Sequence, residues 1–195
     1  MSEETLGPRQ RAAATKRART RKMILDAARP LCDEYGYQGT TREQVAKAAA
    51  VAMPTLSKHF PLKRSLVVAA YEPELLPFIE RAKDAVATEG DAREALIAFV
   101  RELAVMLTDH PTLCRALLPI GREEDPADQF HPLYYELEAV FGKLIETHWK
   151  GEPRYGREPS SSAQYHLMGL LGGISPPNPP RPAEVFSSVV LMSVL

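Results

Sequence analysis

The side chains that could do chemistry in this chain are cations, and they gather in its first third. Residues 1–64 hold 13 Lys/Arg against 6 Asp/Glu, whereas the rest of the chain holds 11 against 19. Arg42 and Lys63 stand at expected helix starts, where backbone N–H groups and the helix dipole already favour an anion. A basic module joined to an acidic one is typical of a nucleic-acid binder with a separate second domain, although a solvated basic tail would give the same charge balance.

No residue pattern points to catalysis or to a metal. The chain has no Gly-x-Ser-x-Gly, no phosphate-binding glycine loop and no His-Glu-x-x-His. His110, His131 and His166 lack ligand-like spacing with a carboxylate or a cysteine, so we predict no metal and no cofactor. The one pair that could touch, His110 and Cys114, has Pro111 between its members. We therefore expect that the protein is not an enzyme.

Helical periodicity dominates the sequence and strand-like alternation is scarce, which predicts an all-α fold. Residues 1–20 are polar and basic, and we expect a flexible arm there. The first domain is expected over 21–70 and begins with three short helices, at 21–35, 42–49 and 53–59. Two of them are joined by a tight turn, which is the helix-turn-helix arrangement whose second helix enters the major groove of DNA.

Local signals mark the ends of these three helices. Gly36 suits the C-cap of the first helix, and Pro30 inside it predicts a kink. Thr41-x-x-Gln44 has the form of a capping box for the second helix. Pro61 ends the third helix, because the residue before a proline disfavours the α region.

The second domain, expected over 71–195, consists of amphipathic helices. A long helix from Lys63 to about Ala87 enters it, and Pro73 and Pro77 predict a kink or a split there. Apolar residues at helical spacing predict further helices around 96–107, 113–118, 132–145 and 163–174, with loops at 121–129, 151–162 and 175–182. The apolar last segment, 183–195, is too short to span a membrane and is expected to be a helix buried against a partner. Its apolar end suggests a truncated chain.

Four stretches of the first domain resemble the TetR family of transcriptional regulators. They are Thr20-Arg21-Lys22-Met23-Ile24-Leu25-Asp26-Ala27-Ala28, Tyr35-Gly36-Tyr37-x-x-Thr40-Thr41, Val45-Ala46-x-Ala48-x-x-Val51 and Thr55-Leu56-x-x-His59-Phe60-x-x-Lys63-x-x-Leu66. In order, they resemble the family's opening helix, the link to the second helix, the second helix with its turn, and the recognition helix with the start of the fourth. The resemblance covers residues 20–70 and implies a sequence-specific DNA-binding regulator, by default a repressor that a small-molecule ligand releases.

The resemblance also implies which side chains meet DNA. Lys63 matches the family's phosphate-contacting lysine, and Lys58 could reach a guanine edge or a phosphate, while Leu56 and Phe60 face the core. The expected DNA-binding residues are Thr41, Arg42, Met53, Pro54, Thr55, Ser57, Lys58, His59 and Lys63. The arginines of the arm could enter an adjacent minor groove. Plainer alternatives are that Thr41 is only a helix cap, that His59 packs at the domain edge, and that the arm arginines are mobile charges.

Three residues depart from the family pattern. Ala50 stands where the family usually has glycine in the turn, and if that residue needs φ > 0 the alanine is strained by about 1 kcal/mol. Ala52 replaces the usual serine cap of the recognition helix, a loss of roughly 1 kcal/mol. Ser57 replaces an aromatic residue that commonly meets the DNA backbone. These departures motivate a rival hypothesis, a helix-turn-helix protein that has lost operator binding and acts through protein contacts.

In the second domain the resemblance implies a ligand pocket and a four-helix dimer interface. Side chains that could line an apolar pocket, or simply form the core, are Phe99, Met106, Leu113, Tyr134, Leu137, Phe141, Trp149 and Tyr165. Gly169, Gly172 and Gly173 would permit close approach of a partner helix, unless they only end their own helix. A ligand that prefers a different angle between the domains would change the spacing of two recognition helices. The expected partners are double-stranded operator DNA, a second copy of the chain and an unknown small molecule, in the cytoplasm and without a membrane.

Overall fold

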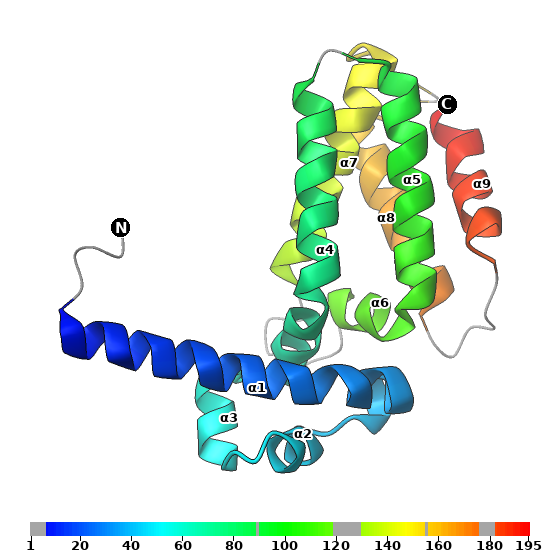
Figure 1. Ribbon diagram of the computed structural model, residues 1–195. Helices are drawn as coiled ribbons and strands as arrows, with labels where there is room; N and C mark the ends of the chain where they lie inside the picture. The colour runs from blue at the N-terminus through cyan, green and yellow to red at the C-terminus, as the bar shows by residue number, and fades with distance from the viewer. Residues whose placement is uncertain (1–6, 89, 119–129, 155, 176–181) are drawn as a thin grey trace. The chain divides into compact units, whose positions relative to one another are not determined.

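The computed structural model describes residues 7–88, 90–118, 130–154, 156–175 and 182–195, and within these ranges the chain is helical with no strand. The predicted all-α fold is confirmed (Figure 1). The chain divides into two compact units, residues 1–70 and residues 71–195. None of the described helices has the length and apolar character needed to cross a membrane.

The first unit is built from three helices and the start of a fourth. They are α1 (Pro8–Gly39), α2 (Arg42–Ala48), α3 (Met53–His59) and the first residues of α4 (Lys63–Ala87). Its core contains Ile24, Ala28, Cys32, Val45 and Leu56, none of which is exposed. The short helices α2 and α3 pack against each other across the turn between them. This is the helix-turn-helix that the sequence predicts, and the bounds of α2 and α3 differ from the expected ones by no more than a residue.

The basic amino-terminal segment is helical where we expected a flexible arm. α1 begins at Pro8 instead of Arg21, so the expectation is wrong for residues 8–20, while residues 1–6 lie outside the described ranges. Ala12, Ala13 and Ala14 are strong helix formers, and Pro8 occupies the first helical position, where a missing N–H costs nothing. Residues 8–19 are exposed on every side of the helix. With no apolar stripe to bury, this segment gives no periodic signal in the sequence.

The two signals inside α1 had different outcomes. The backbone leaves helical dihedral angles only at Gly36, where φ is 68° and ψ is −177°, a conformation open essentially to glycine alone. Pro30 does not interrupt these angles, so the proline does not end the helix, and the kink stays a prediction. Pro30 and Asp26 are both exposed, which lets water bond the Asp26 carbonyl that the proline cannot serve. α4 likewise runs as one helix through Pro73 and Pro77, and the alternative of a split is wrong.

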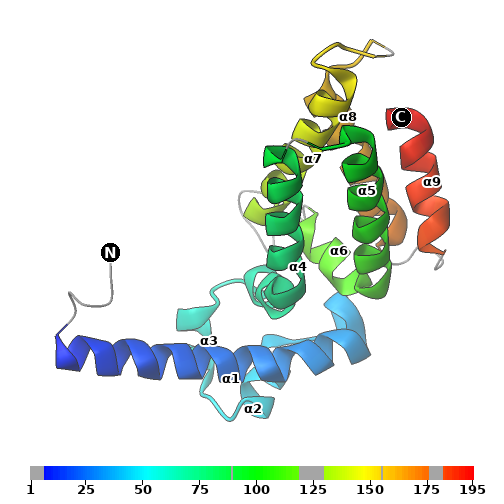
Figure 2. The same cartoon turned by 45° about the horizontal axis from the view of Figure 1, so that its top comes forward.

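The second unit is a helical bundle. After the remainder of α4 come α5 (Ala92–Asp109), α6 (Pro111–Leu117), α7 (Pro132–Trp149), α8 (Pro159–Ile174) and α9 (Ala183–Val194). Figures 1 and 2 show α9 lying along α5, and α7 packs closely on α8. The aromatic rings of Phe78, Phe99 and Phe141 form a column through the centre, with successive centroids 5.1 Å apart.

Sequence signals in this unit are largely confirmed. The stripe of α5 is buried as expected, and Asp91 caps that helix by accepting hydrogen bonds from the backbone N–H groups of Arg93 and Glu94. Pro132 takes the first position of α7. α8 begins at Pro159, inside the expected loop, because a proline is favourable in the first turn of a helix. The expected loop 121–129 lies outside the described residues.

Candidate nucleic-acid interface

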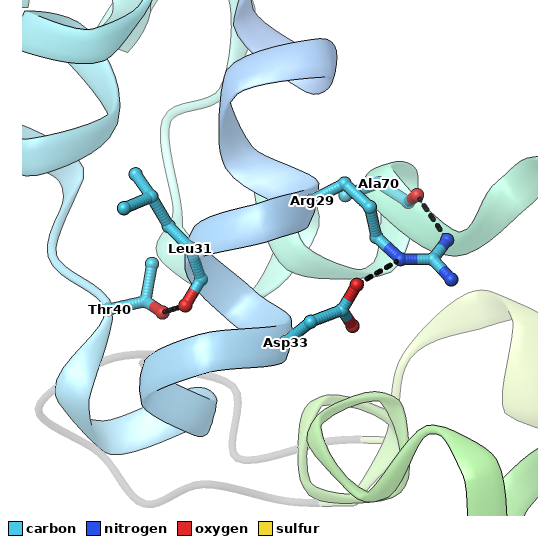
Figure 3. Close-up of polar contacts among 5 residues, drawn as sticks. All are labelled: Arg29, Leu31, Asp33, Thr40 and Ala70. Carbon is cyan, nitrogen blue, oxygen red and sulfur yellow. Dashed lines mark hydrogen bonds and ion pairs between the residues drawn. The ribbon is translucent and has the colours of Figure 1, made fainter.

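A buried threonine sets the angle between α1 and α2. Thr40 is 2% exposed, and its Oγ1 lies 3.0 Å from the carbonyl oxygen of Leu31 (Figure 3). The same oxygen lies 2.8 Å from the carbonyl oxygen of Gly36. The backbone N–H of Thr40 also donates to the carbonyl of Gly36. Carbonyls at the end of a helix need such donors when water is excluded. Thr40 therefore holds the chain where it turns into the helix-turn-helix.

An arginine joins α1 to α4 inside the first unit. The Nε of Arg29 lies 3.1 Å from a carboxylate oxygen of Asp33, and its NH1 donates to the carbonyl of Ala70 over 3.3 Å (Figure 3). Asp33 thus orients the guanidinium along α1, and the guanidinium contacts the last residue of the unit. This contact helps to fix the first turns of α4, which begin with Lys63.

The amino end of α2 has the predicted capping box. Thr41 Oγ1 accepts from the N–H of Gln44 at 3.2 Å, and the side chain of Gln44 accepts from the N–H of Thr41 at 2.7 Å. Beside it, Arg42 NH2 donates to Ser57 Oγ over 2.6 Å, which links α2 to α3. The buried Nε of Arg42 has no hydrogen-bond partner among the described residues. Arg42 and Ser57 therefore hold each other in place at the side of the recognition helix.

The recognition helix α3 has one buried and one exposed face, as the sequence predicts. Leu56 is fully buried and Phe60 is 4% exposed, so these two side chains anchor the helix. On the other side lie three exposed residues, Pro54, Thr55 and Lys58. The remaining candidates of this helix are half-buried: Met53, Ser57 and His59. Thr55 and Lys58 are thus the polar side chains of α3 that stand free to meet a groove of DNA.

The turn before α3 has both weaknesses that the sequence predicts, one at Ala50 and one at Ala52. Ala50 has φ 52°, in the left-handed region, and the N–H of Val51 donates to the carbonyl of Ala46 over 2.9 Å. This is the Schellman geometry, in which glycine is the favoured residue at the left-handed position. Ala52, at the N-cap of α3, makes no side-chain cap bond. Both weaknesses inferred from the sequence are confirmed.

Replacing Ala50 with glycine is expected to stabilise the protein by about 1 kcal/mol, because glycine adopts φ > 0 without the steric cost of a Cβ atom. Thermal or urea unfolding followed by circular dichroism would measure the gain. Ala48→Gly is the matched control: it makes the same chemical change at an exposed helical residue of α2, where glycine is unfavourable. A lower midpoint for both variants would show that the left-handed alanine carries no strain.

Cations surround the exposed face of α3. Lys63 begins α4 and its Nζ lies 4.5 Å from the ring centre of Tyr37, which holds the ammonium at the helix start. The pKa of His59 is lowered first by partial burial and then by the positive charges of Arg17, Arg21 and Lys58. The sequence predicts that Lys58, His59 and Lys63 meet DNA, but it gives no specific position for Arg17. Its nearness to His59 depends on the helical form of residues 8–20.

The candidate pocket residues of the second unit divide into two groups. Six are buried: Phe99, Leu113, Tyr134, Leu137, Phe141 and Trp149. Met106 is half-buried, and Tyr165 is 60% exposed. Tyr165 is not part of the core, because the buried stripe of α8 runs through Ala163, Leu167 and Leu170, and it lines an open groove between α8 and α9 instead.

The sequence did not predict a buried polar pair in the same unit, Tyr134 and Glu138. Tyr134 Oη and Glu138 Oε2 are buried atoms one turn apart on α7, and the tyrosine hydroxyl interacts with the carboxylate. Burial and this neighbouring carboxylate of Glu138 raise the pKa of Tyr134. Polar atoms inside a protein are costly unless their hydrogen bonds are complete, so this pair indicates a place where a further polar group can bind.

No catalytic or metal centre emerges from the described residues. Cys114 is fully buried and its Sγ lies 3.3 Å from the carbonyl oxygen of Leu107. Burial raises the pKa of the thiol, which makes it a poor nucleophile. The ring of His110 lies against Tyr71, with centroids 5.2 Å apart. No group of His, Cys, Asp or Glu in the described ranges is arranged to hold a metal ion.

Comparison with known proteins shows which family the chain belongs to. The family described as bacterial regulatory proteins of the tetR family matches residues 24–70. The transcriptional repressor KstR of Mycolicibacterium smegmatis is 31% identical over 156 residues, which are 79% of this chain and 72% of that protein. The chain belongs to the TetR family. It is a DNA-binding transcriptional regulator.

Two further proteins are similar to this chain. The fatty acid metabolism regulator protein of Bacillus subtilis is 28% identical over 88 residues, 45% of each chain. The structure of Thermus thermophilus FadR, a TetR-family repressor in complex with lauroyl-CoA, superposes with a TM-score of 0.68 over 89% of this chain and 92% of that one. At 19% identity, the latter likeness concerns the fold alone.

Proposed function

We propose that this TetR-family protein reads an operator with the exposed face of α3 and binds the flanking phosphates with cations at helix starts. The supporting observation is the division of α3, in which buried Leu56 and Phe60 anchor a face bearing Thr55 and Lys58. Lys58 has the length to reach a guanine edge, and Thr55 can contact a phosphate or a thymine methyl. Lys63 is assigned to a phosphate. We infer further that the protein acts in the cytoplasm and has no enzymatic activity.

Replacing Lys63 with alanine is expected to weaken binding to every DNA sequence alike. Removing one phosphate contact lowers the slope of log affinity against log salt by about 0.9. Fluorescence anisotropy with a duplex from the protein's own promoter region, titrated against salt and random competitor, would measure this. Lys143→Ala removes the same charge from the exposed surface of α7 and should leave the slope unchanged. Promoter binding no tighter than random-duplex binding would favour instead a protein that acts through protein contacts.

We also propose a homodimer through α8 and α9. Their shared face carries exposed apolar side chains, namely Tyr165, Met168, Val185, Val189 and Met192. A groove of about 540 Å³ runs between the two helices. Gly169 and Gly172 have open space where a Cβ would stand, so the backbone of α8 can be approached closely. An apolar patch of this kind is normally covered by a partner, and a second copy places two recognition helices on two half-sites.

The releasing ligand is proposed to be an apolar molecule with one polar group. The aromatic column of Phe78, Phe99 and Phe141 lines the centre of the second unit with apolar surface. The buried pair of Tyr134 Oη and Glu138 Oε2 would supply the polar contact. Because FadR of Thermus thermophilus binds lauroyl-CoA, that compound is the first probe to add to the promoter-binding assay.

A further inference from the structure

The amino-terminal part of α1 carries positively charged side chains and no negatively charged ones. Between residues 5 and 25 the sequence has seven Lys/Arg and no Asp/Glu. Residues 8–19 are exposed and belong to a regular helix, so these cations stand at fixed positions along a rod. In the two views α1 continues past α3 toward the amino terminus (Figures 1 and 2).

Two of these cations point toward the recognition helix. Arg17 and Arg21 are four residues apart and share the helix face that buries Ile24 and Ala28, because those positions recur at helical spacing. The guanidinium of Arg21 lies 4.8 Å from the ring centre of Phe60, the anchor of α3. Arg17 is close enough to lower the pKa of the neighbouring His59.

This arrangement gathers positive charge on one side of the first unit. Arg17 and Arg21 form a like-charged pair one turn apart, which destabilises a helix. Lys58, exposed on α3, adds a third positive charge to the same side, since it too lowers the pKa of His59. A row of phosphates would relieve the repulsion.

We infer that Arg17 and Arg21 form a second phosphate-binding surface next to Lys58, which holds the DNA backbone beside the bases that α3 reads. The inference rests on the proposed function, since it takes DNA as the partner of α3. From Ile24 to Pro8 the helix rises about 24 Å, the length of roughly seven base pairs. The basic helix that carries the surface is therefore long enough to continue along the DNA past the bases that α3 reads.

The helical form changes the expected mode of contact. A flexible arm could enter the minor groove, but a helix with its side chains is about 10–12 Å across and that groove is only about 6 Å wide. The extension consequently lies along the phosphate backbone. Contacts of this kind position the protein and carry no sequence information.

Arg17→Ala tests the surface, with Arg19→Ala as its matched control. Arg19 is an exposed arginine of the same helix, and two residues turn it by about 200° to the opposite face. Binding of the full chain to a mixed-sequence duplex of about 30 base pairs would be titrated against salt, since non-specific binding depends on phosphate contacts. We expect Arg17→Ala to weaken binding at every salt concentration and to lower the slope by about 0.9. Circular dichroism should show the helix intact, because alanine is the best helix former.

The same titration separates the possible failures. Equal slopes for Arg17→Ala and Arg19→Ala, with a lower slope for Lys63→Ala, would overturn the second surface and leave the proposed function standing. A slope lowered by Arg17→Ala and not by Arg19→Ala supports the surface. If the parent chain binds no duplex, both proposals fall together.

Discussion

Val189→Arg is expected to turn the protein from a dimer of about 43 kDa into a monomer of 21.6 kDa, and to lower operator affinity by about 100-fold or more. Val189 is 61% exposed on α9, in the apolar face that we assign to the partner subunit. An arginine there would be buried without a counter-charge at the interface, whereas in the monomer it stays in water. A dimer binds its second half-site at a high effective concentration, and a monomer loses that advantage.

Light scattering after size-exclusion chromatography would give the mass, and the promoter-binding assay the affinity. Val105→Arg is the matched control, because Val105 is 49% exposed on α5, outside the face shared by α8 and α9. It should leave both mass and affinity unchanged. A Val189→Arg protein that remains a dimer with full affinity would place the interface elsewhere. A monomer with unchanged affinity would show that one recognition helix is enough for operator binding.

Much of this architecture could be predicted because apolar periodicity and helix caps act locally. The stripe of α5, the capping box of Thr41 and the cap of Asp91 each follow from a few neighbouring residues. The strain at Ala50 was also predictable, since a helix that ends in a tight turn commonly needs a left-handed residue. These features depend on short-range geometry, which can be predicted from residues that are neighbours in the sequence.

The features that could not be predicted depend on which side chains are exposed to solvent and on which residues lie next to them in space. The first turns of α1 bury nothing, so their helical form leaves no pattern of apolar residues, and the place of Arg17 beside His59 could not be foreseen. Tyr165 was expected inside because it is aromatic, but its position on α8 turns it outward. The buried pair of Tyr134 and Glu138 becomes visible only when its surroundings are known.

Thr40→Val is expected to destabilise the first unit by about 2 kcal/mol. The substitution keeps the shape of the side chain and removes the buried hydroxyl that contacts the carbonyls of Gly36 and of Leu31, the latter drawn in Figure 3. The Gly36 carbonyl keeps the backbone N–H of Thr40, but with water excluded nothing replaces the lost hydroxyl donor. The hydroxyl also fixes where α2 begins, so the loss should loosen α2 first. Hydrogen exchange at the backbone amides of Val45 and Ala46 would report this opening directly.

Thr88→Val is the control for the same chemical change. The Thr88 hydroxyl donates to the carbonyl of Asp84 over 2.8 Å, but this bond is exposed and water can take its place. We therefore expect a change within about 0.5 kcal/mol for Thr88→Val. We expect faster exchange in α2 for Thr40→Val alone, together with weaker promoter binding as the temperature rises. This result would show that the position of α2 and α3 depends on the hydrogen bonds of the Thr40 hydroxyl. Equal exchange in the two variants would mean that packing of Val45 and Leu56 alone holds α2 and α3 in place.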